Sequence, residues 1–142
     1  MPLFESNWII GNTNGKITGS SITAGEITAI VGQEQDGYGI VNCWVSRGNP
    51  PVSNGSCTSN YNGKLITKDT KGRVSNFLVQ YQDGYGIVNF GVVINEQAYW
   101  VGSNFEGTKH HVDISVGTTF VGFQAREEEG YGIVDMKVWM SS

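Results

Sequence analysis

One eight-residue string occurs three times in the chain, and it constrains the fold more than any other feature. It reads Gln-Asp-Gly-Tyr-Gly-Ile-Val-Asn at 35–42 and at 82–89, and Glu-Glu-Gly-Tyr-Gly-Ile-Val-Asp at 128–135. The first glycines of the copies, Gly37, Gly84 and Gly130, are 47 and then 46 residues apart. A fixed period of this length indicates repeated supersecondary units that share one core. We therefore predict a single domain, 1–142, of three internal repeats at about 1–46, 47–93 and 94–142.

Each repeat has the composition of strands joined by tight turns. The chain contains 20 glycines in 142 residues, only 15% of its residues are charged, and Gly interrupts every window before a helical pattern develops. Asn14-Gly15 and Asn62-Gly63 predict hairpin turns, and the Gly-Tyr-Gly segments predict a second turn in each unit. The predicted fold class is all-β, with about four strands in each repeat.

The residues after each Gly-Tyr-Gly turn alternate between apolar and mixed positions. One face carries nine apolar residues, which we predict to form the core: Val41, Cys43, Val45, Val88, Phe90, Val92, Val134, Met136 and Val138. The opposite face includes Asn42, Asn89 and Asp135 and is expected to be at most partly buried.

Three four-stranded units fit a three-sheet β-prism or, as an alternative, a β-trefoil, although no Gln-x-Trp typical of trefoils occurs. The segment from Gly122-Phe123-Gln124-Ala125-Arg126 through Gly130-Tyr131 to Asp135 resembles the repeat of β-prism I proteins, which include the jacalin-related lectins. Residues 36–42 are similar to the repeat ending of the vitelline membrane outer layer protein I family. The resemblance implies a pseudo-threefold β-prism and either carbohydrate binding or a structural role in an extracellular matrix or coat. The positions matching the sugar-binding Asp of jacalin-type lectins are the apolar Ile40, Ile87 and Ile133, so the jacalin sugar geometry is not transferred.

Each repeated turn presents an acid, a glycine and a tyrosine. Carboxylates bond to sugar hydroxyls, an aromatic ring packs on the C–H face of a sugar, and Gly exposes backbone N–H groups. The predicted carbohydrate-binding residues are Asp36, Gly37, Tyr38, Asp83, Gly84, Tyr85, Glu129, Gly130 and Tyr131. Glu34, Tyr81 and Glu127 are expected on the same rim, and their differences predict sites that are not identical. We predict a multivalent lectin that binds glycans or glycoproteins at up to three sites. In the structural alternative, the Gly-Tyr-Gly string only satisfies the turn, with Tyr packed beneath it.

The sequence offers little for catalysis. No nucleophile elbow or phosphate loop is present, and His110-His111 with Asp113 is weak evidence for a metal site. We expect no enzyme activity, cofactor or metal. A glycoside hydrolase using Glu127, Glu128 or Glu129 is the second alternative. The net charge of −4 and the scattered basic residues argue against nucleic-acid partners, and no apolar stretch is long enough for membrane insertion.

Location and assembly are expectations of the same kind. The chain shown begins without a signal peptide, so it is either cytoplasmic, released without the usual signal, or shown in mature form. Of these we expect a secreted or extracellular protein. Cys43 and Cys57 either form one bridge or remain separate thiols. Trp44 and Trp139 lie in equivalent strands, and we expect at least one of them to be exposed or buried between protomers of a homo-oligomer.

Overall fold

The computed structural model describes residues 2–142, which form twelve strands in three four-stranded sheets. The first sheet has the order β5 (Val52–Ser53), β4 (Gly39–Arg47), β3 (Ile27–Gln35), β6 (Lys64–Asp69). The second has the order β9 (Gln97–Trp100), β8 (Gly86–Ile94), β7 (Val74–Gln82), β10 (Thr108–Asp113). The third has the order β1 (Leu3–Glu5), β12 (Gly132–Ser141), β11 (Thr119–Glu128), β2 (Lys16–Ile22). Within residues 2–142 no helix is long and apolar enough to cross a bilayer.

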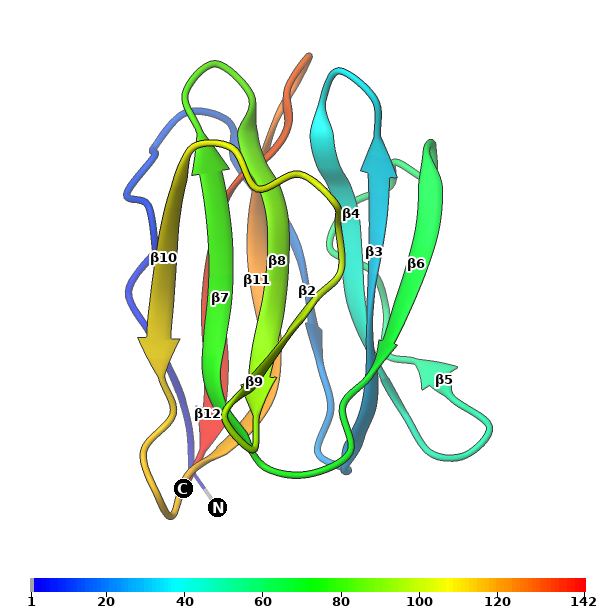
Figure 1. The fold of residues 1–142 in the computed structure, drawn as a ribbon, viewed down its shortest axis with the longest axis vertical. Coiled ribbons are helices and arrows are strands. Elements are labelled where there is room, and N and C mark those ends of the chain that lie inside the picture. The colour runs from blue at the N-terminus through cyan, green and yellow to red at the C-terminus, as the bar shows by residue number, and fades with distance from the viewer. Residues whose placement is uncertain (1) are drawn as a thin grey trace.

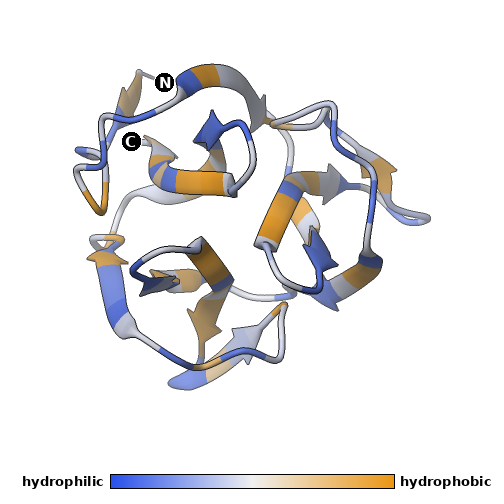
Figure 2. Cartoon of the chain, turned by 90° about the horizontal axis from the view of Figure 1, so that it is seen from above, coloured by the Kyte–Doolittle hydropathy of each residue, from blue (hydrophilic) through white to orange (hydrophobic). Residues whose placement is uncertain are grey.

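The three sheets have the same strand arrangement and surround one axis, as Figure 2 shows from above. This confirms the predicted β-prism in place of the trefoil. The third sheet combines strands from both ends of the chain, and Ser142 N–H donates to Pro2 O at 3.3 Å, so the two ends of the described chain lie close together. The sheets span 27–69, 74–113, and 119–141 with 3–22, so each predicted sequence repeat contributes to two sheets.

The strand that follows each repeated turn lies nearest the axis, and it contains a β-bulge. In β4, Asn42 pairs with Gln33 and Ile40 pairs with Glu34, which leaves Val41 as an extra residue. The same shift occurs in β8 and β12. A bulge reverses the side-chain alternation at one point. It places three isoleucines in the central core, namely Ile40, Ile87 and Ile133.

All nine predicted core residues are buried. The prediction for the opposite face was wrong, because Asn42, Asn89 and Asp135 are 0% exposed. Polar groups buried to this extent need hydrogen-bond partners, and loops that run along the outer face of each sheet provide them. The alternation of the sequence could not show that these loops cover the outer face.

An aromatic cluster fills the middle of the prism. Phe77 lies with its ring centroid 6.1 Å from Phe90, 5.8 Å from Phe120 and 5.7 Å from Phe123. Cys43 and Cys57 belong to the same core as free, buried thiols. Burial raises the pKa of Cys43, and the neighbouring Cys57 thiol raises it further.

The predicted hairpin turns at Asn14-Gly15 and Asn62-Gly63 were wrong. β2 pairs with β11 and not with β1, so Asn14-Gly15 ends a crossing loop instead of a hairpin. Glycine is needed at Gly15 and Gly63 because the backbone there lies very close to a neighbouring strand. A Cβ atom at Gly15 would collide with the carbonyl oxygen of Glu127, and one at Gly63 would collide with that of Glu34.

Trp44 and Trp139 are both half-buried on the outer faces of their sheets. Trp44 packs against Tyr61 of the same chain, with ring centroids 6.2 Å apart. The cover of Trp44 is thus intramolecular, and this tryptophan gives no support for a protomer interface.

Candidate functional site

The three repeated turns lie together at one end of the prism, which is the upper end in Figure 1. Each turn is closed by a 3.0 Å hydrogen bond from the tyrosine N–H to the carbonyl three residues earlier. The first glycine of each turn has φ between 84° and 87°, a value that suits glycine in a turn. A Cβ atom at Gly37, Gly84 or Gly130 would meet nothing within 4 Å. The first glycine therefore serves the backbone conformation alone.

The second glycine of each turn serves packing as well. A Cβ atom at Gly39 would lie 2.7 Å from the carbonyl oxygen of Ile87, and one at Gly86 would lie 2.6 Å from that of Ile133. Gly132 makes the equivalent approach to Ile40 and closes the ring, with a Cβ distance of 3.1 Å. The three turns thus pack against one another around the axis, which explains both glycines of the string without any ligand.

The tyrosines between these glycines are not explained in this way. Tyr38, Tyr85 and Tyr131 are 39%, 44% and 43% exposed, so their rings do not lie packed beneath the turns. A tyrosine ring with this much free surface offers an apolar face and a hydroxyl group to a ligand.

Three buried polar residues hold loops beside the turns. The Asp135 carboxylate accepts hydrogen bonds from the N–H groups of Ile10, Gly11 and Asn12, at 2.8–2.9 Å. Asn42 accepts from Thr58 N–H at 2.9 Å and donates to Thr58 O at 3.1 Å.

Asn89 binds Gly102 in the same manner, accepting at 2.6 Å and donating at 2.9 Å. The three residues are equivalent in the repeat, and each fixes the backbone of one crossing loop. Because Asp135 is buried and its oxygens are occupied by loop N–H groups, it stabilises the fold.

These loops carry a second set of equivalent residues, which the sequence reasoning missed. Asn12, Asn60 and Asn104 each accept a 2.9 Å hydrogen bond from the N–H two residues ahead. Each therefore forms an Asx turn, in which the side chain caps its own loop. The signal was present in the sequence, because an Asn stands two residues before each Asn-Gly or Glu-Gly pair.

Turns and loops together form three grooves, each between two neighbouring turns. The 1–2 groove has a volume of about 160 Å³ and is lined by Glu34, Asp36, Gly37, Tyr38, Tyr85, Ser103 and Asn104, among others. The 2–3 groove, about 200 Å³, is lined by Asn12, Asn14, Tyr81, Gly84, Tyr85, Glu128 and Tyr131. The 3–1 groove, about 310 Å³, is lined by Lys16, Tyr38, Asn60, Glu127, Glu128, Glu129, Gly130 and Tyr131. Every turn tyrosine therefore borders two grooves.

Eight of the nine predicted binding residues line these grooves, whereas Asp83 lines none of the three. The expectation for Glu34, Tyr81 and Glu127 is confirmed, since each lines one groove. Their chemistry makes the grooves unequal. The 1–2 groove is acidic, the 2–3 groove gathers three tyrosines, and the 3–1 groove combines Lys16 with three glutamates.

Two polar contacts preset the shape of the grooves. In the 2–3 groove the Asn12 amide donates to the Tyr81 hydroxyl at 3.3 Å. In the 1–2 groove the Glu34 carboxylate accepts from Ser103 N–H at 3.2 Å. In the 3–1 groove partial burial raises the pKa of Glu127, while nearby Lys16 acts in the opposite direction.

The histidines lie elsewhere, on β10. His111 Nε2 is 3.6 Å from an Asp113 oxygen, and both side chains are more than half exposed. Across residues 2–142, no three His, Cys, Asp or Glu side chains gather closely enough to hold a metal ion.

The fold is that of the β-prism lectins, as comparison with solved structures shows. Frutalin from Artocarpus incisa superposes with a TM-score of 0.70 at 14% identity, covering 100% of this chain and 97% of frutalin. The artocarpin–mannotriose complex gives a TM-score of 0.68 at 16% identity, covering 100% and 99% of the two chains. A mannose-binding lectin from champedak gives 0.69 at 17% identity, covering 100% and 99%. No protein-family model matches the sequence, and no curated protein matches it.

Proposed function

We propose that this protein is a multivalent carbohydrate-binding protein whose binding places are the three grooves between neighbouring turns. The observation that carries the proposal is the ring of half-exposed tyrosines, each of which borders two grooves. In each groove a tyrosine face stands beside Asn and carboxylate side chains. Sugars combine an apolar C–H face with hydroxyl groups, and this pairing of side chains is complementary to both.

The comparisons support the same class of ligand. Two of the superposed proteins are described by mannotriose and by mannose binding, although the likeness to this chain lies in the fold. All three grooves open at one end of the prism, so a surface rich in glycans can contact more than one of them. Weak single sites gain strength in such an arrangement.

A glycan-array screen of the wild-type protein beside a Tyr38→Ala, Tyr85→Ala, Tyr131→Ala triple variant tests the proposal. Selective binding by the wild type, lost in a triple variant that retains its thermal transition, is the expected result. Absence of saturable binding by the wild type would contradict the proposal and favour a structural role in a matrix or coat.

A matched pair of acid variants tests whether the grooves, and not the turns as such, bind. Asp36 lines the 1–2 groove, whereas Asp83 occupies the equivalent turn position outside all three grooves. We expect Asp36→Ala to weaken binding in the 1–2 groove, while Asp83→Ala leaves every affinity unchanged. If the two variants lost equal amounts of binding affinity, the sugar would bind at the individual turns and not in the grooves between them.

The proposal includes no catalysis, cofactor or metal. The 3–1 groove contains Glu127, Glu128 and Glu129, so hydrolysis of nitrophenyl glycosides is the direct test of the hydrolase alternative. Turnover that disappears in Glu127→Gln would contradict a purely binding role.

We further propose that the protein acts outside the cell, where glycans are displayed, and that it forms homo-oligomers. Light scattering at micromolar concentration tests the second point, and a strictly monomeric mass would refute it. The first is tested by fractionating the source, with the native protein expected in the extracellular fraction.

A further inference from the structure

The two ends of the prism are closed differently. At the turn end, Ile40, Ile87 and Ile133 are 0% exposed and seal the axis. At the opposite end, three apolar residues at or next to the start of β3, β7 and β11 keep a small exposed fraction. Ile27, Val74 and Phe120 are 7%, 8% and 5% exposed, and they line a cavity of about 540 Å³.

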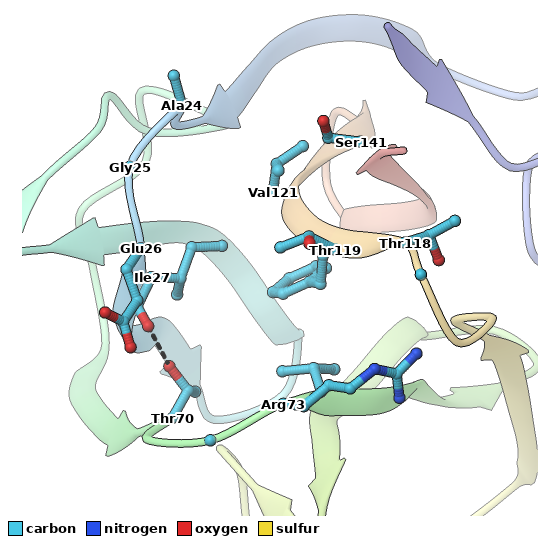
Figure 3. Close-up of a pocket in the computed structure, with 14 residues that line it drawn as sticks. Ala24, Gly25, Glu26, Ile27, Thr70, Arg73, Thr118, Thr119, Val121 and Ser141 are labelled. Carbon is cyan, nitrogen blue, oxygen red and sulfur yellow. Dashed lines mark hydrogen bonds between the residues drawn. The ribbon is translucent and has the colours of Figure 1, made fainter. Parts of the chain in front are cut away.

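The cavity has an apolar floor and a polar rim, as Figure 3 shows. Ile27, Val74, Phe120 and Val121 form the floor. The rim comes from three connecting turns, at 24–26, at 70–73 and at 117–119. An apolar cavity of this volume with a few polar groups at its mouth is typical of sites for small molecules.

Hydrogen bonds tie the segments around the mouth to neighbouring strands and loops. Thr23 N–H donates to Val121 O at 2.9 Å, and Thr70 N–H donates to Thr28 O at 3.2 Å. Thr70 also donates its hydroxyl to Ile27 O, the bond drawn in Figure 3. Arg73 donates through Nη2 to the carbonyl oxygens of Ile114 and Ser115, both at 2.6 Å. The rim is thus tied together without a ligand, and little ordering cost remains for binding.

The charges at the mouth balance. Glu26 and Arg73 lie on different sides of the opening, and their charged groups point away from each other in Figure 3. Neither of them forms an ion pair within residues 2–142. The Thr118 hydroxyl already donates to Ser115 O at 2.7 Å, so the uncharged polar group that remains at the mouth is the hydroxyl of Thr119. This balance favours a neutral ligand over an ion.

We propose that this cavity is a second binding site, which takes a neutral, largely apolar ring compound with one hydrogen-bonding group. The ring system lies on Ile27, Val74, Phe120 and Val121, where it displaces water from apolar surface, and the polar group meets the Thr119 hydroxyl at the rim. The site is at the end of the prism opposite the three grooves and does not depend on the proposed glycan binding.

Titration with the neutral naphthalene dye PRODAN tests the proposal by its fluorescence. We expect a blue shift with saturable one-to-one binding and a dissociation constant on the order of 0.1 mM. Thr119→Trp places a large side chain at the mouth from an exposed position and is expected to weaken binding at least tenfold. The same substitution at Thr67, an exposed residue of β6, is the matched control and should leave binding unchanged.

A second blocking variant guards against misfolding of the first. A Cβ atom at Gly25 would lie 3.7 Å from its nearest neighbours, an ordinary contact, so Gly25→Phe adds a ring at the rim without a clash at Cβ. Saturable binding that survives both blocking variants, or no saturable binding by the wild type, would overturn the proposal. Tighter binding of the anionic dye ANS would overturn the preference for a neutral ligand. A wild-type dimer that Thr119→Trp dissociates, without dye binding, would assign the opening to a second copy of the chain.

Discussion

Replacing Asp135 with Asn tests how the crossing loops are held. The carboxylate accepts from Ile10 N–H at 2.9 Å through Oδ1, and from Gly11 and Asn12 N–H at 2.8 and 2.9 Å through Oδ2. An amide keeps the first bond but turns an NH₂ group toward two N–H donors. Two hydrogen bonds to a charged group are lost, each worth about 1.5–3 kcal/mol, and relief of the buried charge offsets part of that loss.

We therefore expect Asp135→Asn to lower the free energy of unfolding by about 2–4 kcal/mol. For a chain of this size that corresponds to a Tm lowered by roughly 5–15 °C. Differential scanning calorimetry at neutral pH measures it, and Asp69→Asn on the exposed side of β6 is the control, with an expected change within about 0.5 kcal/mol. The reasoning would be refuted if Asp135→Asn changed the stability no more than this control.

Three further predictions concern the turns, one carboxyl group and the thiols. Gly84→Ala should lower the free energy of unfolding by about 1 kcal/mol, because only the positive φ of Gly84 opposes a side chain. Gly86→Ala should lower it clearly more, since its Cβ atom would also clash with the neighbouring repeat. Urea titration measures both losses, and equal losses would contradict the packing of the turns. The raised pKa of Glu127 means that the folded state holds the proton of this carboxyl group more tightly than the unfolded state does. The resulting stabilisation is present below the ordinary pKa of 4.5 and declines as the pH rises through the folded pKa. Glu127→Gln should remove this decline from unfolding curves measured against pH, and a decline that persists in the variant would come from another group. Cys43 and Cys57 should resist DTNB at pH 8 in the native protein and react together after denaturation; rapid native labelling would contradict their burial, and no labelling after denaturation would show a disulfide.

The repeat made most of the fold predictable. Near-identical strings at a constant spacing require equivalent environments, and three equivalent four-stranded units close around an axis. The apolar alternation after each turn also located buried strand positions correctly. It failed for Ile40, Ile87 and Ile133, which simple alternation puts on the face opposite the core. A bulge at Val41 and its equivalents turns them into the core, and no property of the side chains indicates an extra residue in a strand.

The candidate site was predictable only in part. The acid–Gly–Tyr pattern led to the correct end of the prism, and both glycines of each turn are explained by geometry. Each groove lies between two turns that are far apart in the sequence. Which turns become neighbours is decided only when the three sheets close into a prism. The spacing of Asn12, Asn60 and Asn104 was visible in the sequence, but their place beside the turns depends on the path of the crossing loops. Asn42 and Asn89 were misjudged for the same reason, since those loops bury them.

The central claim is that sugar binds between turns, so that each tyrosine belongs to two sites. Isothermal titration calorimetry of Tyr85→Ala against the wild type, with the tightest glycan from the array, tests it through stoichiometry. Tyr85 borders the 1–2 and 2–3 grooves, and we expect the variant to lose these two sites and to retain the 3–1 groove. Loss of only one site would place binding on the individual turns and contradict this account.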